Sequence, residues 1–90
     1  MIRERLVRRH IVKDAIKRDC GDRKIIAYAD LDNRKFKSLL KHINPVEVRS
    51  LNDYNDNDCL YTSRLRWNGE LVAMCATKGD EFHLWLGGAI

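Results

Sequence analysis

The sequence predicts an α+β fold, with helices packed on an antiparallel β-meander that consists of a three-stranded C-terminal meander plus one further strand. Three observations support this prediction. Apolar side chains recur at helical spacing through residues 2–20, they recur with a period of two after residue 59, and an Asn-Gly pair interrupts the second pattern. A chain of 90 residues is enough for one hydrophobic core. We therefore expect a single small domain over residues 1–90, with a basic N-terminal helix at about 2–20 and an α/β body at about 24–90.

The N-terminal segment is typical of an amphipathic helix. Apolar residues spaced four apart form two adjacent ladders, Val7, Ile11 and Ala15 in one and Val12, Ile16 and Cys20 in the other. Gly21 follows, at the position where a residue of left-handed conformation usually ends a helix. Arg8 and Arg9 lie beside the ladders and interrupt the apolar stripe. We expect this helix to cover a surface only partly or to dock on another chain.

The middle of the chain is predicted to alternate between a strand and two further helices. Residues 24–31 are apolar enough for a strand, and Asp32 can N-cap a helix through about Ile43. Asn44-Pro45-Val46-Glu47 predicts a short third helix through Leu51, because Asn at the N-cap, Pro at the first position and Glu at the third nearly form a capping box. The polar residues 52–58 predict a loop. The apolar face of the second helix would consist of Phe36, Leu39, Leu40 and Ile43.

The C-terminal third is predicted to be a meander. Asn68-Gly69 is typical of a two-residue type I′ turn between antiparallel strands. Gly79-Asp80 can turn the chain again into a third strand over Phe82–Leu86. The simplest register of the hairpin pairs Trp67 with Glu70, Leu65 with Val72, Ser63 with Met74 and Tyr61 with Ala76.

Charge and cysteine usage narrow the class of protein. Seventeen Lys and Arg against thirteen Asp and Glu give a net charge of +4, and the basic residues gather in the N-terminal half. The chain has no apolar run of about 20 residues and no charged segment leading into an apolar one, so we expect neither a membrane span nor a secretory signal. The spacing of Cys20, Cys59 and Cys75 fits neither a disulfide framework nor a zinc site. We expect a cytoplasmic protein with reduced, mostly buried thiols, no bound metal or cofactor and no membrane partner.

Few motifs in the sequence indicate chemistry. It contains no glycine-rich phosphate loop, and no Ser-His or Cys-His pair stands in a context that suggests a nucleophile. Asp30 and Asp32 could face a metal, but capping of the helix explains Asp32. Arg64 and Arg66 lie on the predicted hairpin and, with nearby aromatic residues, resemble a platform for nucleic acid. Those aromatic residues, which can equally form a core, are Tyr28, Tyr54, Tyr61, Trp67 and Trp85.

Two stretches of the sequence are similar to a known family. LRWNGELVAMCA at residues 65–76 is similar to the second and third strands of the GNAT (acetyltransferase) superfamily, and HLWLGG at residues 83–88 resembles a strand of acetyltransferase-like proteins from tailed bacteriophages. The resemblance spans residues 24–88 and implies the N-terminal half of such a domain. That family binds acetyl-CoA on a Q/R-x-x-G-x-G/A turn at a helix N-terminus, which has no counterpart here. We therefore carry over no catalytic residue and expect no binding of acetyl-CoA.

These features predict a small non-catalytic interaction protein that binds another protein. The resemblance implies a bacteriophage protein that binds or inhibits a host protein in the host cytoplasm. Two alternatives stay open, a nucleic-acid-binding module and an acyltransferase completed by dimerisation or a partner, and the oligomeric state is not predicted. The candidate binding residues are basic residues of the N-terminal helix and the hairpin, namely Arg3, Arg5, Arg8, Arg9, Lys13, Lys17, Arg18, Arg64 and Arg66.

Overall fold

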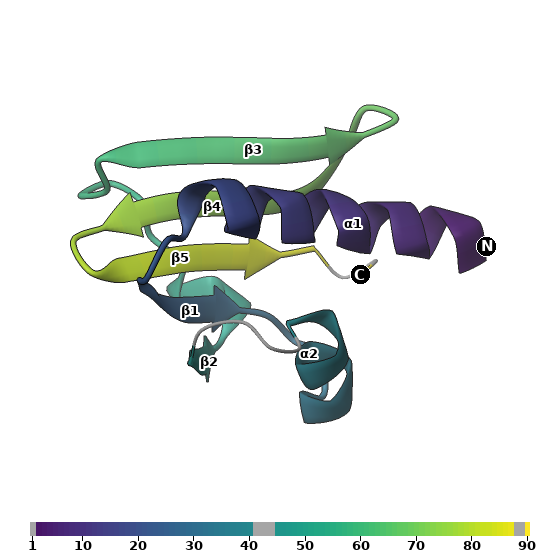
Figure 1. The fold of residues 1–90 in the computed structure, drawn as a ribbon, viewed down its shortest axis with the longest axis horizontal. Helices are drawn as coiled ribbons and strands as arrows, with labels where there is room; N and C mark the ends of the chain where they lie inside the picture. Colours follow the sequence, from purple (N-terminus) through teal and green to yellow (C-terminus); the bar gives the residue numbers. More distant parts are fainter. Residues whose placement is uncertain (1, 41–44, 88–89) are drawn as a thin grey trace.

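The chain forms a five-stranded sheet with α1 and α2 packed on one of its faces (Figure 1). This computed structural model describes residues 2–40, 45–87 and 90. The predicted α+β class is confirmed. The elements in chain order are α1 (Ile2–Asp19), β1 (Lys24–Tyr28), α2 (Asn33–Leu39), β2 (Val46–Arg49), the 3-10 turn η1 (Leu51–Asp53), β3 (Tyr61–Trp67), β4 (Glu70–Lys78) and β5 (Glu81–Leu86).

The sheet is mixed, and its strands lie in the order β2-β1-β5-β4-β3. β1 pairs in parallel with β2 and with β5, whereas β4 pairs antiparallel with β5 and with β3. The predicted C-terminal meander of three antiparallel strands is thus confirmed. Two strands, rather than the one predicted, join it in parallel, and α2 supplies the crossover that a parallel pair such as β1 and β2 requires.

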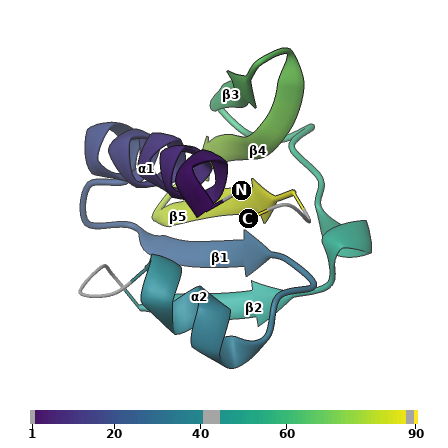
Figure 2. The same ribbon diagram turned by 90° about the vertical axis from the view of Figure 1, so that its right-hand side faces the viewer.

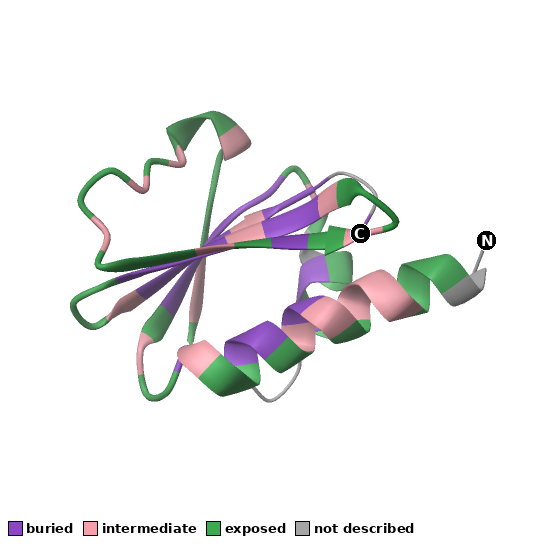
Figure 3. Ribbon diagram, turned by 90° about the horizontal axis from the view of Figure 1, so that it is seen from above, coloured by how far each residue is buried: buried purple, intermediate pink, exposed green. Residues whose placement is uncertain are grey.

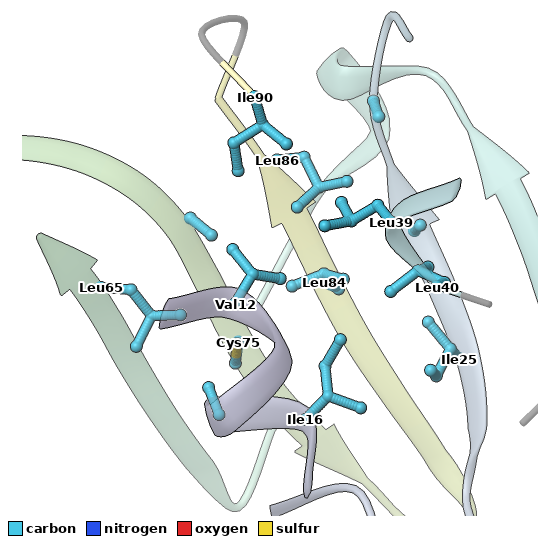
Figure 4. Packing of buried hydrophobic residues seen from close by; sticks show 14 of the residues in the cluster. Val12, Ile16, Ile25, Leu39, Leu40, Leu65, Cys75, Leu84, Leu86 and Ile90 are labelled. Carbon is cyan, nitrogen blue, oxygen red and sulfur yellow. The ribbon is translucent and has the colours of Figure 1, made fainter. Parts of the chain in front are cut away.

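The hydrophobic core lies between the helices and one face of the sheet, which we call the helix face (Figure 4). Strand side chains alternate between the two faces, so every second residue of β1 and β5 reaches this core. The predicted apolar ladders of α1 point into it, with their C-terminal halves fully buried and Ile11 partly buried. Its members include Val12, Ile16, Ile25, Leu39, Phe82, Leu84 and Leu86.

The hairpin has the predicted turn but not the predicted register along its whole length. Asn68 and Gly69 have φ values of 51° and 80°, as a type I′ turn requires, and Trp67 pairs with Glu70. Beyond Arg66 the register shifts, so that Leu65 pairs with Ala73 and the predicted partner Val72 becomes the extra residue of a bulge. Because of this shift, Met74 pairs with Arg64 and lies on the face away from the helices.

Gly87 closes this bulge from the end of β5. Its amide donates to the carbonyl of Val72 at 2.9 Å. A Cβ atom at position 87 would lie only 2.8 Å from that carbonyl oxygen, a separation that backbone atoms do not tolerate. The bulge therefore depends on two local features that a period-two pattern does not contain, an extra residue in β4 and a close backbone approach at Gly87.

The predicted short helix after Pro45 is wrong, because Val46–Arg49 forms the edge strand β2. Val46 pairs with Ile25 and packs against the core, so tertiary pairing of a strand with two Val residues outweighs the local capping pattern. The predicted N-cap of α2 is confirmed, since the Asp32 carboxylate accepts from the Lys35 amide at 2.8 Å. α2 ends at Leu39 with Leu40 as its C-cap, so it is shorter than the predicted helix, and Ile43 and Asn44 lie outside the described residues.

Residues 50–60 cross the sheet from one edge to the other. β2 and β3 are the two edge strands, so the segment between them, which begins with η1, must pass over a face (Figure 2). It passes on the side opposite α1 (Figure 3). We call that side the second face. The helices thus cover one face of the sheet, and residues 50–60 cover part of the other.

Candidate protein-binding surface

One row of side chains crosses the second face from edge to edge. The cross-strand pairs Arg64–Met74, Met74–Trp85, Trp85–Tyr28 and Tyr28–Arg49 are consecutive. Directly paired residues share a face, so these five side chains form a transverse line with a cation at each end and Met, Trp and Tyr between them. Side-chain exposure decreases from β3 inward. Arg64 is exposed, Met74 and Trp85 are partly exposed, and Tyr28 is 3% exposed, whereas Arg49 at the other end of the line is exposed again.

A buried chain of hydrogen bonds lies beside the inner end of this row. The Tyr28 hydroxyl is 2.8 Å from His83 Nδ1, and His83 Nε2 is 3.1 Å from a carboxylate oxygen of Glu81. Arg49 Nη1 lies 3.5 Å from the same hydroxyl. A carboxylate only accepts, so in the neutral imidazole Nε2 carries the proton and donates to Glu81, and Nδ1 accepts from the hydroxyl of Tyr28.

Ion pairs extend the chain to the edge of β2. Glu47 accepts from Lys24 Nζ at 2.9 Å and from Arg49 Nε. The hydrogen bond from Lys24, followed by that from Arg49, lowers the pKa of the Glu47 carboxyl below its ordinary value. The hydrogen bond to Glu47 also raises the pKa of the Arg49 guanidinium, so both groups stay charged at neutral pH.

The segment that crosses the second face covers this polar chain. The ring of Tyr54 meets the ring of Tyr28 edge-on, with centroids 5.3 Å apart, and burial raises the pKa of the Tyr54 phenol. His83 is 5% exposed, and its ring stacks on that of Tyr28. The Tyr28 hydroxyl is therefore enclosed, and the geometry suits a group that fixes β1, β5 and the covering segment rather than one that meets a substrate.

The sheet separates the nine basic residues that the sequence proposes as a binding site. Those of α1 lie on the helix face, whereas Arg64 and Arg66 are exposed on the second face of β3. The structure therefore does not form one continuous basic patch from them. Arg5 and Lys17 are exposed, Lys13 is partly exposed, Arg18 is exposed and pairs with Asp19, and the side chain of Arg3 lies outside the description.

Two arginines of α1 contribute to packing. Arg8 is 12% exposed and donates to the Glu70 carboxylate at 2.6 Å, which ties α1 to the start of β4. Arg9 is half-buried, and its Nη2 lies 3.5 Å from the carbonyl oxygen of Ile90. These contacts hold the two side chains against the domain, so neither extends freely toward a partner.

The exposed surface along β3 is the part of the molecule that is available to bind a partner. Leu60 is 91% exposed and Tyr61 is 47% exposed, although both are large hydrophobic residues. Arg64 and Arg66 follow at alternate positions of the strand, and neither forms an ion pair with any carboxylate that the structure describes. Arg66 reaches only the carbonyl of Gly69, at 3.5 Å. Because side chains alternate along the strand, Tyr61 lies on the helix side of β3, and Thr62, Arg64 and Arg66 lie on the second face. We call these four residues, with Leu60 just before the strand, the β3 surface.

The aromatic residues contribute less to this surface than the sequence suggests. Tyr28 is buried, Tyr54 packs on it, and Trp67 packs against the core. Only Tyr61 is exposed, and Trp85 is partly exposed. The interpretation of these residues as core is therefore confirmed for Tyr28 and Trp67.

Sequence reasoning missed the buried polar chain. The spacing of Glu81 and His83 places both on one face of a strand, which is a signal that the period-two pattern contains. Their connection to Tyr28 depends on the parallel pairing of β5 with β1, which brings together residues 55 positions apart. No local pattern in the sequence predicts that pairing.

Cys20 and Cys75 are buried, and Cys59 is partly exposed. Burial raises the pKa of the Cys75 thiol to about 12 and raises that of Cys59 as well. Among the residues with a described position, no three His, Cys, Asp or Glu side chains are placed to hold a metal ion. No helix within the described ranges is both long and apolar enough to cross a membrane.

Comparisons with known proteins identify no family for this chain. No protein-family model matches the sequence, and neither a curated protein nor a solved structure matches the chain. The resemblance to the acetyltransferase superfamily therefore stays a prediction. The β3 surface is the candidate site that the geometry of this chain supports best.

Proposed function

We propose that this chain is a non-catalytic interaction protein that binds another protein through the β3 surface. The observation that carries the proposal is that the edge strand β3 exposes Tyr61 on its helix side and Arg64 and Arg66 on the second face, with Leu60 exposed just before the strand begins. Aromatic residues, Met and Arg are the residue types enriched at protein interfaces, and they dominate the binding energy there. A large hydrophobic residue that is almost fully exposed gains most from being covered by a partner.

Because the stretch at residues 83–88 resembles bacteriophage proteins, the test looks for the partner in a bacterial lysate. A photo-crosslinking amino acid, p-benzoylphenylalanine, replaces Thr62 on β3 or, as a matched control, Lys37 on α2. Both positions are exposed, and they lie on opposite faces of the sheet. After irradiation in a bacterial lysate, we expect a discrete protein adduct from position 62 only. Equal adducts from both positions, or none from position 62, would contradict the proposal.

A nucleic-acid-binding module is the second candidate, because Arg64 and Trp85 belong to the same transverse row. Arg provides phosphate contacts, and a partly exposed Trp provides a face on which a base can stack. This candidate requires that nuclease treatment of the lysate abolishes the adduct from position 62. It also requires that a single-stranded oligonucleotide binds with a steep salt dependence, with a slope of about −0.7 per phosphate contact. A nuclease-resistant adduct favours the protein partner.

A further inference from the structure

The free edge of β3 is the feature of the β3 surface that most restricts the partner. β3 ends the sheet order and is seven residues long, whereas the other edge strand, β2, has four. An edge strand presents alternate backbone N–H and C=O groups that no neighbouring strand satisfies. A partner that offers an extended segment can pair with these groups, and specificity then comes from alternate side chains.

The edge lacks most of the devices that prevent such pairing. Pro45 is the one proline of the chain and lies outside β3. The extra residue of the bulge, Val72, belongs to β4, so the backbone of β3 from Tyr61 to Leu65 stays regular on its outer side. Two charged side chains on the second face, Arg64 and Arg66, remain as the only obstacle within this strand.

Arg64 and Arg66 favour negatively charged side chains on a strand that adds to β3. Alternate residues of a strand lie roughly 7 Å apart on one face, so Arg64 and Arg66 would stand opposite side chains two positions apart in the incoming segment. Carboxylates at those positions would pair with guanidinium groups that have no acidic partner among the described residues. A second copy of this chain fits poorly, because antiparallel pairing of β3 with itself would place arginines of the two copies close together.

We propose that an extended segment of the partner protein, with Asp or Glu at alternate positions, adds to β3 as a further strand of the sheet. The proposal rests on the proposed function and states how the partner is bound. Acidic side chains of the segment would face Arg64 and Arg66, and its other side chains would lie beside Tyr61 and the N-terminal helix. Main-chain hydrogen bonds would supply affinity, and the charge pattern would supply selectivity.

The experiment uses a synthetic peptide as long as β3, seven residues, with Glu alternating with Val. Two further versions carry backbone N-methyl groups, at the even positions in one and at the odd positions in the other. Each blocks the hydrogen bonds of one edge of the peptide. Fluorescence anisotropy should show that N-methylation of one edge weakens binding at least about tenfold while N-methylation of the other leaves it within about twofold.

A charge reversal tests the role of the arginines. In the variant Arg64→Glu/Arg66→Glu, the Glu peptide should bind at least about tenfold more weakly, and a peptide with Lys in place of Glu should now bind. The control Arg34→Glu/Lys37→Glu changes the same amount of charge on exposed positions of α2 and should leave both affinities unchanged. Circular dichroism confirms that each variant is folded.

Three results would overturn strand addition. The first is the absence of binding by the Glu peptide. The second is an equal loss of affinity in the two N-methylated peptides, and the third is the same change in peptide affinity in both charge-reversal variants. A discrete adduct from position 62 together with any of these results would preserve the proposed function and reject only the mode of binding. Loss of that adduct would reject the proposed function itself.

Discussion

The Tyr28 hydroxyl and His83 Nδ1 lie 2.8 Å apart beneath the segment that covers the second face. Both residues are almost fully buried, and they come from the first and the last strand of the chain. The contact is therefore a product of the parallel pairing between β1 and β5. Its loss would leave a buried ring nitrogen without its partner, which is more costly than the net gain from an exposed hydrogen bond.

We predict that Tyr28→Phe lowers the free energy of unfolding by about 1–3 kcal/mol, because it removes the hydroxyl and leaves His83 Nδ1 unsatisfied. Urea denaturation followed by circular dichroism measures the change. The double variant Tyr28→Phe/His83→Leu should be less destabilised than the sum of the two single variants, since it removes both polar partners. Additive effects would show that the hydrogen bond does not couple these residues.

Sequence reasoning predicted the elements that depend on neighbouring residues. The i, i+4 ladders of α1, the cap at Asp32 and the turn at Asn68-Gly69 each have a local cause, and each is present in the structure. The strand β2 was missed because Val46 gains its stability from pairing with Ile25, a partner 21 positions away. Long-range pairing of this kind leaves no periodic signal within its own segment.

The candidate site was predictable only in part, for the same reason. Alternation in the predicted hairpin places Arg64 and Arg66 on one face, and the structure shows both of them exposed there. The exposure of Tyr61 depends on β3 being an edge strand, and the order of strands in the sheet is a property of the whole fold. The tie between Arg8 and Glu70 likewise joins elements far apart in sequence.

The turn of the hairpin gives a second prediction. Gly69 has a φ of 80°, and nothing lies within 4 Å of a Cβ atom built there, so a substitution meets only backbone strain. We expect Gly69→Val to lower the free energy of unfolding by more than about 1 kcal/mol, because a β-branched residue resists positive φ. Gly69→Asn, the matched control, should retain most of the stability. Equal midpoints of thermal unfolding for the two variants would contradict this role of the turn.

The thiols give a third prediction, and its sign follows from the direction of the pKa shift. Burial raises the pKa of Cys75 to about 12, above the value of 9.0 for an unperturbed thiol. The folded state therefore keeps a proton that the unfolded state loses, so stability is complete below about pH 9 and falls as the pH rises toward 12.

In that range, Cys75→Ala should show a shallower loss of stability with pH than the wild type, by up to about 1.4 kcal/mol per pH unit. Denaturation in urea at a series of pH values measures both slopes. Parallel slopes for the variant and the wild type would exclude Cys75 as the origin of the effect.

At neutral pH, a thiol reagent should modify the partly exposed Cys59 before the buried Cys20 and Cys75, which should react only after unfolding.

The last prediction concerns Arg8, which the sequence suggests is more important for binding than for folding. Arg8 is 12% exposed and donates to Glu70 at 2.6 Å, so we expect Arg8→Glu to lower the free energy of unfolding by about 1 kcal/mol or more. The swapped variant Arg8→Glu/Glu70→Arg should recover part of that loss, because it restores opposite charges at the same two positions. Lys17→Glu, an exposed change of the same charge on the same helix, should alter stability by less than about 0.5 kcal/mol. If Arg8→Glu were as stable as Lys17→Glu and the swap had no effect, Arg8 would be free to serve a partner, and the N-terminal helix would again compete with the β3 surface as the site of binding.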